Sequence, residues 1–333
     1  MKNKLIGVVC ICVFILGCNI TKTEEDNINT DGSQPDNNKS YSFPPYITPI
    51  ESYFEFSIDE DPVISEESYK LEIHGLVEKP YSYTLSELRK MPMHERFQTT
   101  ECIGNQPNGE LIGTVLWKGF SVYDLLVDSL GLKENARTVN FICADGYVSS
   151  NSLEELESLE VIGAIYANQE VLPIKMGFPL RILNTGYYGV KNPGWVTEIE
   201  VTSEGKRDYW IESSWKVDDP MEVDSKIFFP DETSVWSVGD TIPIGGAAFG
   251  SNPIVSVEYS IDGGDNWMFA DIVKTSEGGN AWVFWKTNIV AETSGDFNLR
   301  TRATDFSGHT QPLIDNFGFD GTNSSPIIQL IIR

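Results

Sequence analysis

The pattern of apolar and polar positions changes character near residue 217. Before that point, short alternating runs typical of β-strands are mixed with runs whose apolar residues recur at helical spacing. These runs predict strands at residues 69–75, 138–143, 180–183 and 195–201, and short helices at 84–90, 120–131 and 152–159. Ser152 is expected to cap the last of these helices. Because strands and helices alternate irregularly, this half is predicted to be α+β and not a regular βαβ series.

Beyond residue 217 only alternating runs remain, at residues 241–244, 254–261, 281–286 and 297–303. Glycine-containing turns separate them, such as Asp262-Gly-Gly264. Short strands at this spacing predict an all-β sandwich. We therefore expect a domain boundary near residues 217–225, with one folded domain over residues 41–217 and a second over 218–333.

The first forty residues differ from both halves. Two lysines precede an apolar run over residues 5–17, which is typical of a signal peptide and shorter than the ~20 residues of a spanning helix. The run ends in Leu16-Gly17-Cys18, which resembles the lipobox of bacterial lipoproteins. This predicts a lipoprotein signal peptide over 1–17, lipidation of Cys18 and a flexible, polar tether over 18–40. The alternatives are an ordinary signal peptide with a chance cysteine, or an uncleaved anchor.

Export with a lipid on Cys18 would place the folded body on the outer face of a bacterial membrane, on its periplasmic or cell-surface side. The chain has 333 residues, enough for two domains, and its 41% hydrophobic content is that of a globular protein. Its 49 acidic residues outnumber 24 basic ones, giving a formal net charge of -25. This charge argues against nucleic-acid binding and would repel an anionic substrate in the absence of a local basic pocket.

Candidate chemistry is sparse. The three histidines have no partner at metal-ligand spacing, and neither a Gly-x-Ser-x-Gly motif nor a phosphate-binding glycine loop is present. The distinctive feature is Thr99-Thr-Glu-Cys-Ile-Gly-Asn105, where a thiol at a strand end precedes a glycine-containing loop. From the residues alone, Cys102 has three interpretations: a ligand, one half of a disulfide with Cys143, or a buried core residue.

Longer segments in both halves resemble the sulfite oxidase family. They are Cys102–Asn105, Trp117–Leu126, Val139–Tyr147 with Ser150, Gly177–Arg181, Gly186–Lys191 with Trp195, and Val257–Trp267, in which an Asp-Gly-Gly turn leads to a tryptophan. Residues 51–56 are also similar to a segment at the start of that family's domain. The resemblance implies an α+β molybdopterin-binding, sulfite oxidase-like domain followed by an all-β immunoglobulin-like sandwich of the dimerisation type.

The resemblance also implies roles for six residues. Cys102 matches the thiolate that ligates molybdenum, a soft ligand suited to this metal. Tyr147 matches an active-site tyrosine whose phenol hydrogen-bonds the substrate. Cofactor contacts are implied for Asn105, Asp145, Arg181 and Lys191, with Arg181 binding the phosphate of the pterin.

Each of these positions has an ordinary interpretation as well. Tyr147 would otherwise be an aromatic residue at the surface end of a strand, and Asn105 and Asp145 would be turn formers. Arg181 would be a charge on a strand face paired with a carboxylate, and Lys191 a solvated loop lysine.

The chain departs from the family at four positions. Met176 stands where the family has histidine, Gly194 where it has lysine, and Pro107 and Phe56 where the sulfite-handling enzymes have arginines. A sulfite site needs convergent cations, so a neutral or less charged substrate is expected.

The expected function is therefore that of a molybdenum-cofactor-dependent oxidoreductase that transfers an oxygen atom at a Cys102-ligated metal. Haem, flavin and NAD are not expected because their sequence motifs are missing, so electrons would pass to a separate carrier. The family's second domain implies a homodimer. The alternative is a cofactor-free binding or structural lipoprotein on the same fold, motivated by the four departures and by a leader without the arginine pair of signals that export folded proteins.

Overall fold

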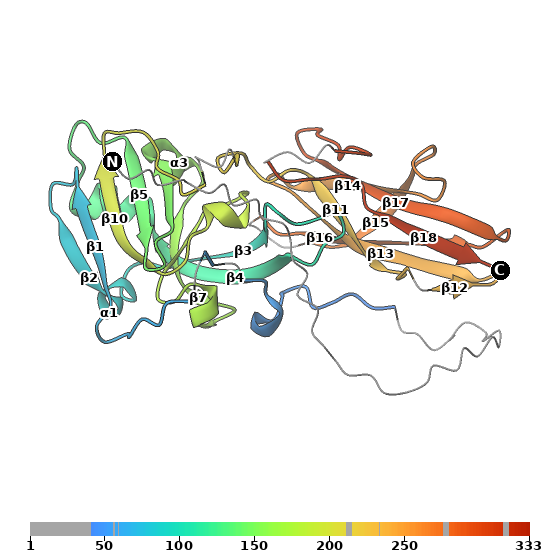
Figure 1. Ribbon diagram of the computed structural model, residues 1–333, viewed down its shortest axis with the longest axis horizontal. Coiled ribbons are helices and arrows are strands. Elements are labelled where there is room, and N and C mark those ends of the chain that lie inside the picture. Colours follow the sequence, from blue (N-terminus) through green and yellow to red (C-terminus); the bar gives the residue numbers. More distant parts are fainter. Residues whose placement is uncertain are drawn as a thin grey trace, which may run out of the picture. The chain divides into compact units, whose positions relative to one another are not determined.

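The computed structural model describes residues 41–55, 57–58, 60–210, 215–232, 234–275, 280–315 and 320–333. The predicted signal peptide, Cys18, the tether and Phe56 lie outside these residues. Figure 1 shows the chain with its elements labelled. No helix within the described residues is long and apolar enough to cross a membrane.

The first half contains two sheets. One has the order β2-β1-β10-β5-β6 and is formed by Tyr81–Thr84, Lys70–Gly75, Val196–Thr202, Thr138–Cys143 and Val148–Ser152. The pair β1 and β10 is parallel, and the other pairs are antiparallel. The second has the order β3-β4-β7-β8 and is formed by His94–Glu101, Ile112–Ser121, Ile162–Ala167 and Glu170–Val171, with β9, Arg181–Leu183, paired to β7.

The helices of this half are short and capped as their sequences predict. Thr84 and Glu87 form a reciprocal capping box at α1, Leu85–Leu88, and Ser152 and Glu155 form another at α3, Leu153–Ser158. The helix expected over residues 120–131 is different. Its first two residues complete β4, α2 covers only Val122–Asp124, and Leu125–Leu130 form a π-helix, η2, that ends at Gly131 with φ 73°.

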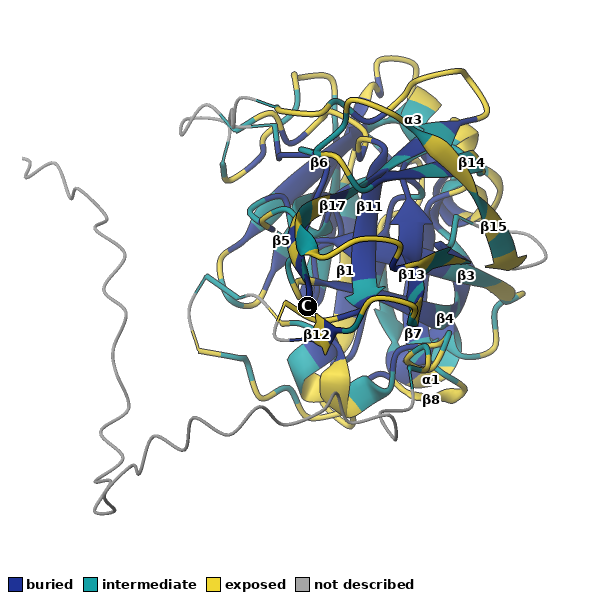
Figure 2. Cartoon of the chain, turned by 90° about the vertical axis from the view of Figure 1, so that its right-hand side faces the viewer, coloured by how far each residue is buried: buried dark blue, intermediate teal, exposed yellow. Residues whose placement is uncertain are grey.

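The second half is all β, as predicted. Its strand order is β11-β13-β16-β15-β14-β17-β18-β12. The strands are Asp224–Phe229 (β11), Val235–Trp236 (β12), Thr241–Phe249 (β13), Ile254–Ser260 (β14), Met268–Lys274 (β15), Val283–Val290 (β16), Gly295–Asp305 (β17) and Ile327–Ile332 (β18). Figure 2 shows β11 and β13 mostly buried. A core that includes Trp285, Leu299 and Leu330 lies inside the sandwich.

A separate apolar cluster joins the two halves, which belong to one compact unit. It contains Ile103 and Ile112 from the loop and strand after Cys102, together with Phe249 and Trp282 from the sandwich. The Trp282 backbone N–H donates to Thr99 Oγ1 at 2.6 Å. The sandwich therefore supports the end of β3, where the Cys102 loop begins.

Candidate functional site

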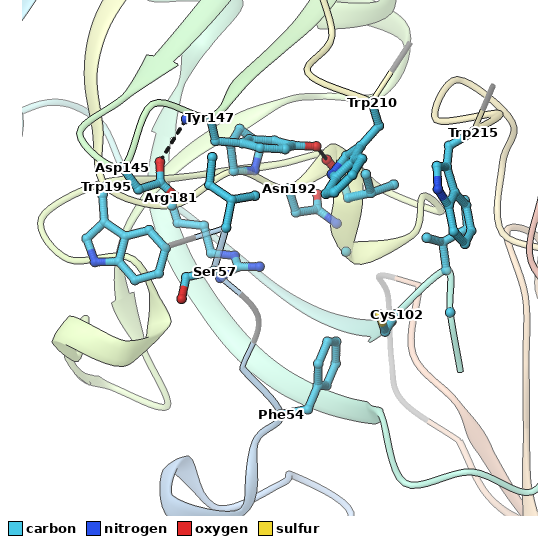
Figure 3. A pocket seen from close by; sticks show the side chains of 17 residues that line it. Phe54, Ser57, Cys102, Asp145, Tyr147, Arg181, Asn192, Trp195, Trp210 and Trp215 are labelled. Carbon is cyan, nitrogen blue, oxygen red and sulfur yellow. Dashed lines mark hydrogen bonds between the residues drawn. The ribbon is translucent and has the colours of Figure 1, made fainter. Parts of the chain in front are cut away.

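A pocket of about 290 Å³ lies where the Cys102 loop, the β5–β6 turn, the start of β9 and the 3-10 helix η4, Gly189–Lys191, meet (Figure 3). Its lining is mostly apolar and rich in aromatic side chains, which include Phe54, Tyr147, Trp195, Trp210 and Trp215. Cys102, Asp145 and Arg181 line the same pocket. The structure thus brings four of the six residues singled out from the sequence to one cavity.

Cys102 directly follows β3 and begins a tight loop. Its backbone N–H donates to the Leu111 carbonyl at 2.9 Å, and its carbonyl accepts from the Asn105 N–H at 2.8 Å. The Cys102 thiol is half-buried and the Cys143 thiol is buried; both are free, so the two form no disulfide. Burial raises the pKa of the Cys102 thiol although the Gly104 N–H opposes this. Since a thiol must lose its proton to ligate a metal, metal binding here would release a proton.

Asp145 and Tyr147 come from the β5–β6 turn. Gly146, at φ 88°, permits the turn, and Asp145 Oδ1 accepts from the Tyr147 N–H at 3.0 Å. The Tyr147 phenol donates to the Val190 carbonyl at 2.7 Å. Burial raises the pKa of this phenol, so it stays protonated at neutral pH and acts as a hydrogen-bond donor.

Arg181, at the start of β9, is a cation without a counter-ion among the described residues. Its Nη1 donates to the Met176 carbonyl at 3.1 Å, and its Cζ lies 5.8 Å from the centroid of the Trp117 ring. The Nε atom is buried without a hydrogen-bond partner, and none of the ion pairs in the described part of the chain includes Arg181. Burial lowers the pKa of this guanidinium. Pairing with a carboxylate, the ordinary interpretation of Arg181, is therefore wrong, and the group is suited to binding an anion from the pocket.

Asn105 and Lys191 do not line the pocket. Asn105 Nδ2 donates to Glu101 Oε1 at 2.9 Å, and its Oδ1 accepts from the Leu111 N–H at 3.0 Å, so this side chain braces the Cys102 loop. Lys191 is 1% exposed, and interpreting it as a solvated lysine is wrong. A direct contact of either residue with a cofactor stays a prediction.

Three of the four departures from the family pattern lie within the described residues. The Met176 side chain is buried in a core cluster, and neither it nor Pro107 lines the pocket. Gly194 does line it, packed so closely that a Cβ added there would lie 2.5 Å from Gly177 Cα. Among the described lining residues, Arg181 is therefore the single cation.

Three aromatic residues of the lining were not singled out from the sequence. Phe54 belongs to the segment 51–56, whose similarity to the family was noted without a role for this residue. Trp210 and Trp215 belong to the segment between β10 and β11, which has no strand or helix periodicity. Their one signal is the occurrence of two tryptophans in a short polar stretch.

The carboxyl group of Glu101, directly before Cys102, is expected to make stability depend on pH. Glu101 is 3% exposed, and burial raises its pKa to about 8, although the Asn105 bond and Lys226 oppose the shift. Because the ordinary pKa is 4.5, the folded chain holds a proton here that the unfolded chain releases. This contribution to stability is complete below pH 4.5 and is lost as the pH rises through about 8.

The free energy of unfolding should therefore fall with pH in this window by up to about 1.4 kcal/mol per pH unit from this group. Glu101→Gln should make the dependence less steep, leaving the part that comes from Asp224, whose pKa is also raised by burial and by the charge of Glu101. Glu95→Gln, at an exposed position of the same strand, should leave the dependence unchanged. Denaturant titrations at pH 5, 6.5 and 8 measure the effect. Equal slopes for the wild type and Glu101→Gln would contradict the assignment.

Comparison with known proteins adds an independent finding. Residues 59–210 match a family described as the oxidoreductase molybdopterin binding domain, and residues 215–326 match the Mo-co oxidoreductase dimerisation domain. Sulfite oxidase from Arabidopsis thaliana is 25% identical over 328 residues, which cover 80% of this chain and 82% of that protein. The chain is also 22% identical over 331 residues to nitrate reductase [NADH] 1 of Phaseolus vulgaris, with 80% of this chain and 37% of that protein covered.

A solved structure shows the same fold. The sulfane dehydrogenase SoxCD from Paracoccus pantotrophus superposes with a TM-score of 0.71 at 24% sequence identity, covering 81% of this chain and 76% of that chain.

Proposed function

This chain belongs to the sulfite oxidase family of molybdopterin-binding oxidoreductases, and on that premise we propose that Cys102 holds the molybdenum of a pterin cofactor in the pocket. When bound, the cofactor supplies oxygen-atom transfer coupled to a two-electron redox change. The observation that carries the proposal is that one pocket is lined by a free thiol and by a guanidinium that has no counter-ion among the described residues. Molybdenum and pterin measured in the full-length wild type and in Cys102→Ser test it.

The residues of the pocket fit such a group at both ends. Arg181 Nε is buried and unpaired, and the planar fork of a guanidinium matches a terminal phosphate. The Cys102 thiol offers a soft ligand. A Cβ added at Gly104, beside Cys102, would meet no atom of the described residues within 4 Å, so these residues leave room beside the thiol.

Tyr147 is proposed to donate a hydrogen bond to the substrate. Its phenol lines the pocket, is protonated at neutral pH and donates to the Val190 carbonyl in the described structure. A substrate oxygen would compete with the Val190 carbonyl for this proton. Asp145, which accepts from the Tyr147 N–H, fixes the turn that presents the ring.

Tyr147→Phe is accordingly expected to lower kcat of the loaded enzyme by about a hundredfold, the usual scale of a lost proton donor. It should also lower the free energy of unfolding by about 1 kcal/mol through loss of the Val190 hydrogen bond. Tyr209→Phe is the matched control, because the Tyr209 ring lies 5.5 Å from that of Tyr147 and the residue is exposed. An unchanged kcat in Tyr147→Phe would refute the role in donation.

We propose further that the substrate is uncharged or carries less charge than sulfite. Arg181 is the single cation of the described lining, and under this proposal the cofactor's phosphate occupies it. Gly194 offers no cation where the family has lysine, and the net charge of -25 repels anions from the whole protein.

The substrate proposal is tested with oxygen-atom donors and acceptors of different charge, namely sulfite, nitrate and dimethyl sulfoxide. The expected order of kcat/KM is the neutral compound first and the dianion last, with salt raising activity on sulfite most. Sulfite as the preferred substrate at low salt would contradict it.

The N-terminal segment supports a proposed location and partners. We propose export, cleavage before Cys18 and lipid anchoring at that residue. We also propose that this chain binds no haem, flavin or NAD and therefore passes its electrons to a separate carrier. Residues 215–326, which match a dimerisation domain, support a homodimer. Mass spectrometry of the mature N-terminus and light scattering of the lipid-free body test these two points.

A further inference from the structure

Lys191, which adjoins residues of the pocket lining, contacts two acidic residues of one segment. It is the last residue of η4. The two preceding residues, Gly189 and Val190, and the following one, Asn192, line the pocket. Its Nζ donates to Asp208 Oδ1 at 3.2 Å and to Asp218 Oδ1 at 2.5 Å. Both acids belong to the connector, defined here as the described residues 203–210 and 215–223 between β10 and β11.

The two carboxylates hold the connector in different ways. Asp208 is as buried as Lys191, and its Oδ1 also accepts from Ser149 Oγ at 3.1 Å and from the Ser150 N–H at 3.0 Å, which attaches it to β6. Its Oδ2 has no hydrogen-bond partner among the described residues, so this carboxylate depends on the Lys191 charge.

Asp218 is 41% exposed, and its Oδ1 also accepts from Lys206 Nζ at 3.1 Å. Burial alone would raise the pKa of Asp218, but the bonds from Lys191 and Lys206 outweigh it and lower the pKa. Asp218 is therefore held as a carboxylate at neutral pH.

The connector carries two tryptophans of the pocket wall. Trp210 follows Asp208 by two residues and Trp215 precedes Asp218 by three, and both line the pocket with Cys102 (Figure 3). The Tyr209 ring lies 4.9 Å from that of Trp210 and 5.5 Å from that of Tyr147, which extends this aromatic wall to the β5–β6 turn.

We propose that Lys191 is a positioning residue that fixes both described flanks of the connector to η4 and thereby holds Trp210 and Trp215 as the pocket wall beside Cys102. The sequence resemblance implied a direct cofactor contact for Lys191, whereas its Nζ is directed to two carboxylates. The consequence is that one buried ammonium sets access to the thiol and the shape of the apolar side of the pocket. This inference rests on the proposed function only in taking the pocket as the site of reaction.

The test is the rate at which N-ethylmaleimide labels Cys102 in the full-length chain made without cofactor, quantified by peptide mass spectrometry. Two variants loosen the connector. Lys191→Met combined with Asp208→Asn removes both buried charges together so that neither is left uncompensated. Asp218→Ala releases only the half-exposed end, where folding is least at risk. Lys216→Met is the matched control, because this lysine lies on the same connector and forms an exposed ion pair with Asp320.

Both loosening variants are expected to label Cys102 at least about fivefold faster, as local opening of a few contacts predicts, with the control unchanged. Buried Cys143 is the internal reference and should label at the wild-type rate. Labelling of Cys102 that stays at the wild-type rate, or that rises in step with Cys143, would overturn the proposal, since the latter reports general unfolding.

A second measurement uses the loaded enzyme. Asp218→Ala should raise KM with a smaller change in kcat, because the substrate wall is displaced while Cys102 and Tyr147 are untouched. A fall in kcat with KM unchanged would contradict a role in shaping the wall. Since the labelling experiment needs no metal, a chain that fails to bind molybdenum would overturn the proposed function and leave this inference standing.

Discussion

Replacing Cys102 by serine is expected to lower the molybdenum content of the purified protein at least about tenfold. Even the mutation of a residue that only supports a metal ligand typically lowers metal affinity by about 10- to 100-fold. The hydroxyl of serine is a harder and far less acidic ligand than a thiol. The fold should persist, since the Cys102 loop is held by backbone hydrogen bonds to Leu111 and Asn105 that do not involve the thiol. Metal analysis by mass spectrometry, with circular dichroism as a check of folding, measures both outcomes.

Cys143→Ser is the matched control for this experiment. Cys143 lies on β5, is buried and does not line the pocket, so its replacement should leave the metal content unchanged. Molybdenum retained in a folded Cys102→Ser protein, or lost equally in both variants, would show that Cys102 is not the ligand.

Replacing Arg181 by methionine is expected to have opposite effects on binding and on stability. The cofactor-free protein should become more stable by about 1 kcal/mol, because a half-buried cation that has no counter-ion among the described residues is replaced by an apolar side chain. Retention of the pterin cofactor should fall sharply, because the proposed partner of its phosphate is lost. Denaturant unfolding of the cofactor-free chain and fluorescence of the oxidised pterin measure the two effects.

Arg96→Met distinguishes this effect from a general consequence of removing a half-buried arginine. Burial also lowers the pKa of Arg96, but its guanidinium donates to the Glu160 carbonyl and to Thr185. Its replacement should therefore destabilise the chain, with the opposite sign to Arg181→Met. If Arg181→Met destabilises the cofactor-free protein as much as Arg96→Met does, Arg181 is a structural residue and does not bind the phosphate.

Local sequence patterns predicted the strands in which apolar and polar residues alternate as their burial does, and the helices that begin at a capping residue. The strand over residues 138–143 has the predicted bounds, and Thr84 and Ser152 form the capping boxes of α1 and α3. The patterns did not predict β3, His94–Glu101, because its buried end consists of polar residues such as Gln98 and Thr99. Contacts of β3 with the sandwich, including the Thr99 bond to the Trp282 N–H, bury them, and local periodicity does not encode such distant contacts.

The strands β15 and β18 were missed for related reasons. Most of Met268–Lys274 is exposed in spite of its apolar residues, so its burial does not alternate as the strand rule expects. Segment Ile327–Ile332 is almost continuously apolar, a pattern that periodicity alone does not assign to a strand.

In the candidate site too, residues within recognisable sequence segments were predicted, whereas residues brought there by long-range contacts were not. Cys102, Asp145, Tyr147 and Arg181 were singled out by their resemblance to a family, and the structure places all four on one pocket. Trp210 and Trp215 could not be found this way, because an aperiodic connector brings them to the pocket. The surroundings of Lys191 were also beyond the sequence, since its two carboxylate partners are 17 and 27 residues away.

The most direct test of the central claim, that this fold holds a molybdenum cofactor, is metal and pterin analysis of the full-length protein purified from its own host grown with ample molybdate. The account predicts stoichiometric molybdenum together with a fluorescent product of pterin oxidation. Folded protein that contains neither would contradict it and would favour a cofactor-free binding or structural protein on the same fold.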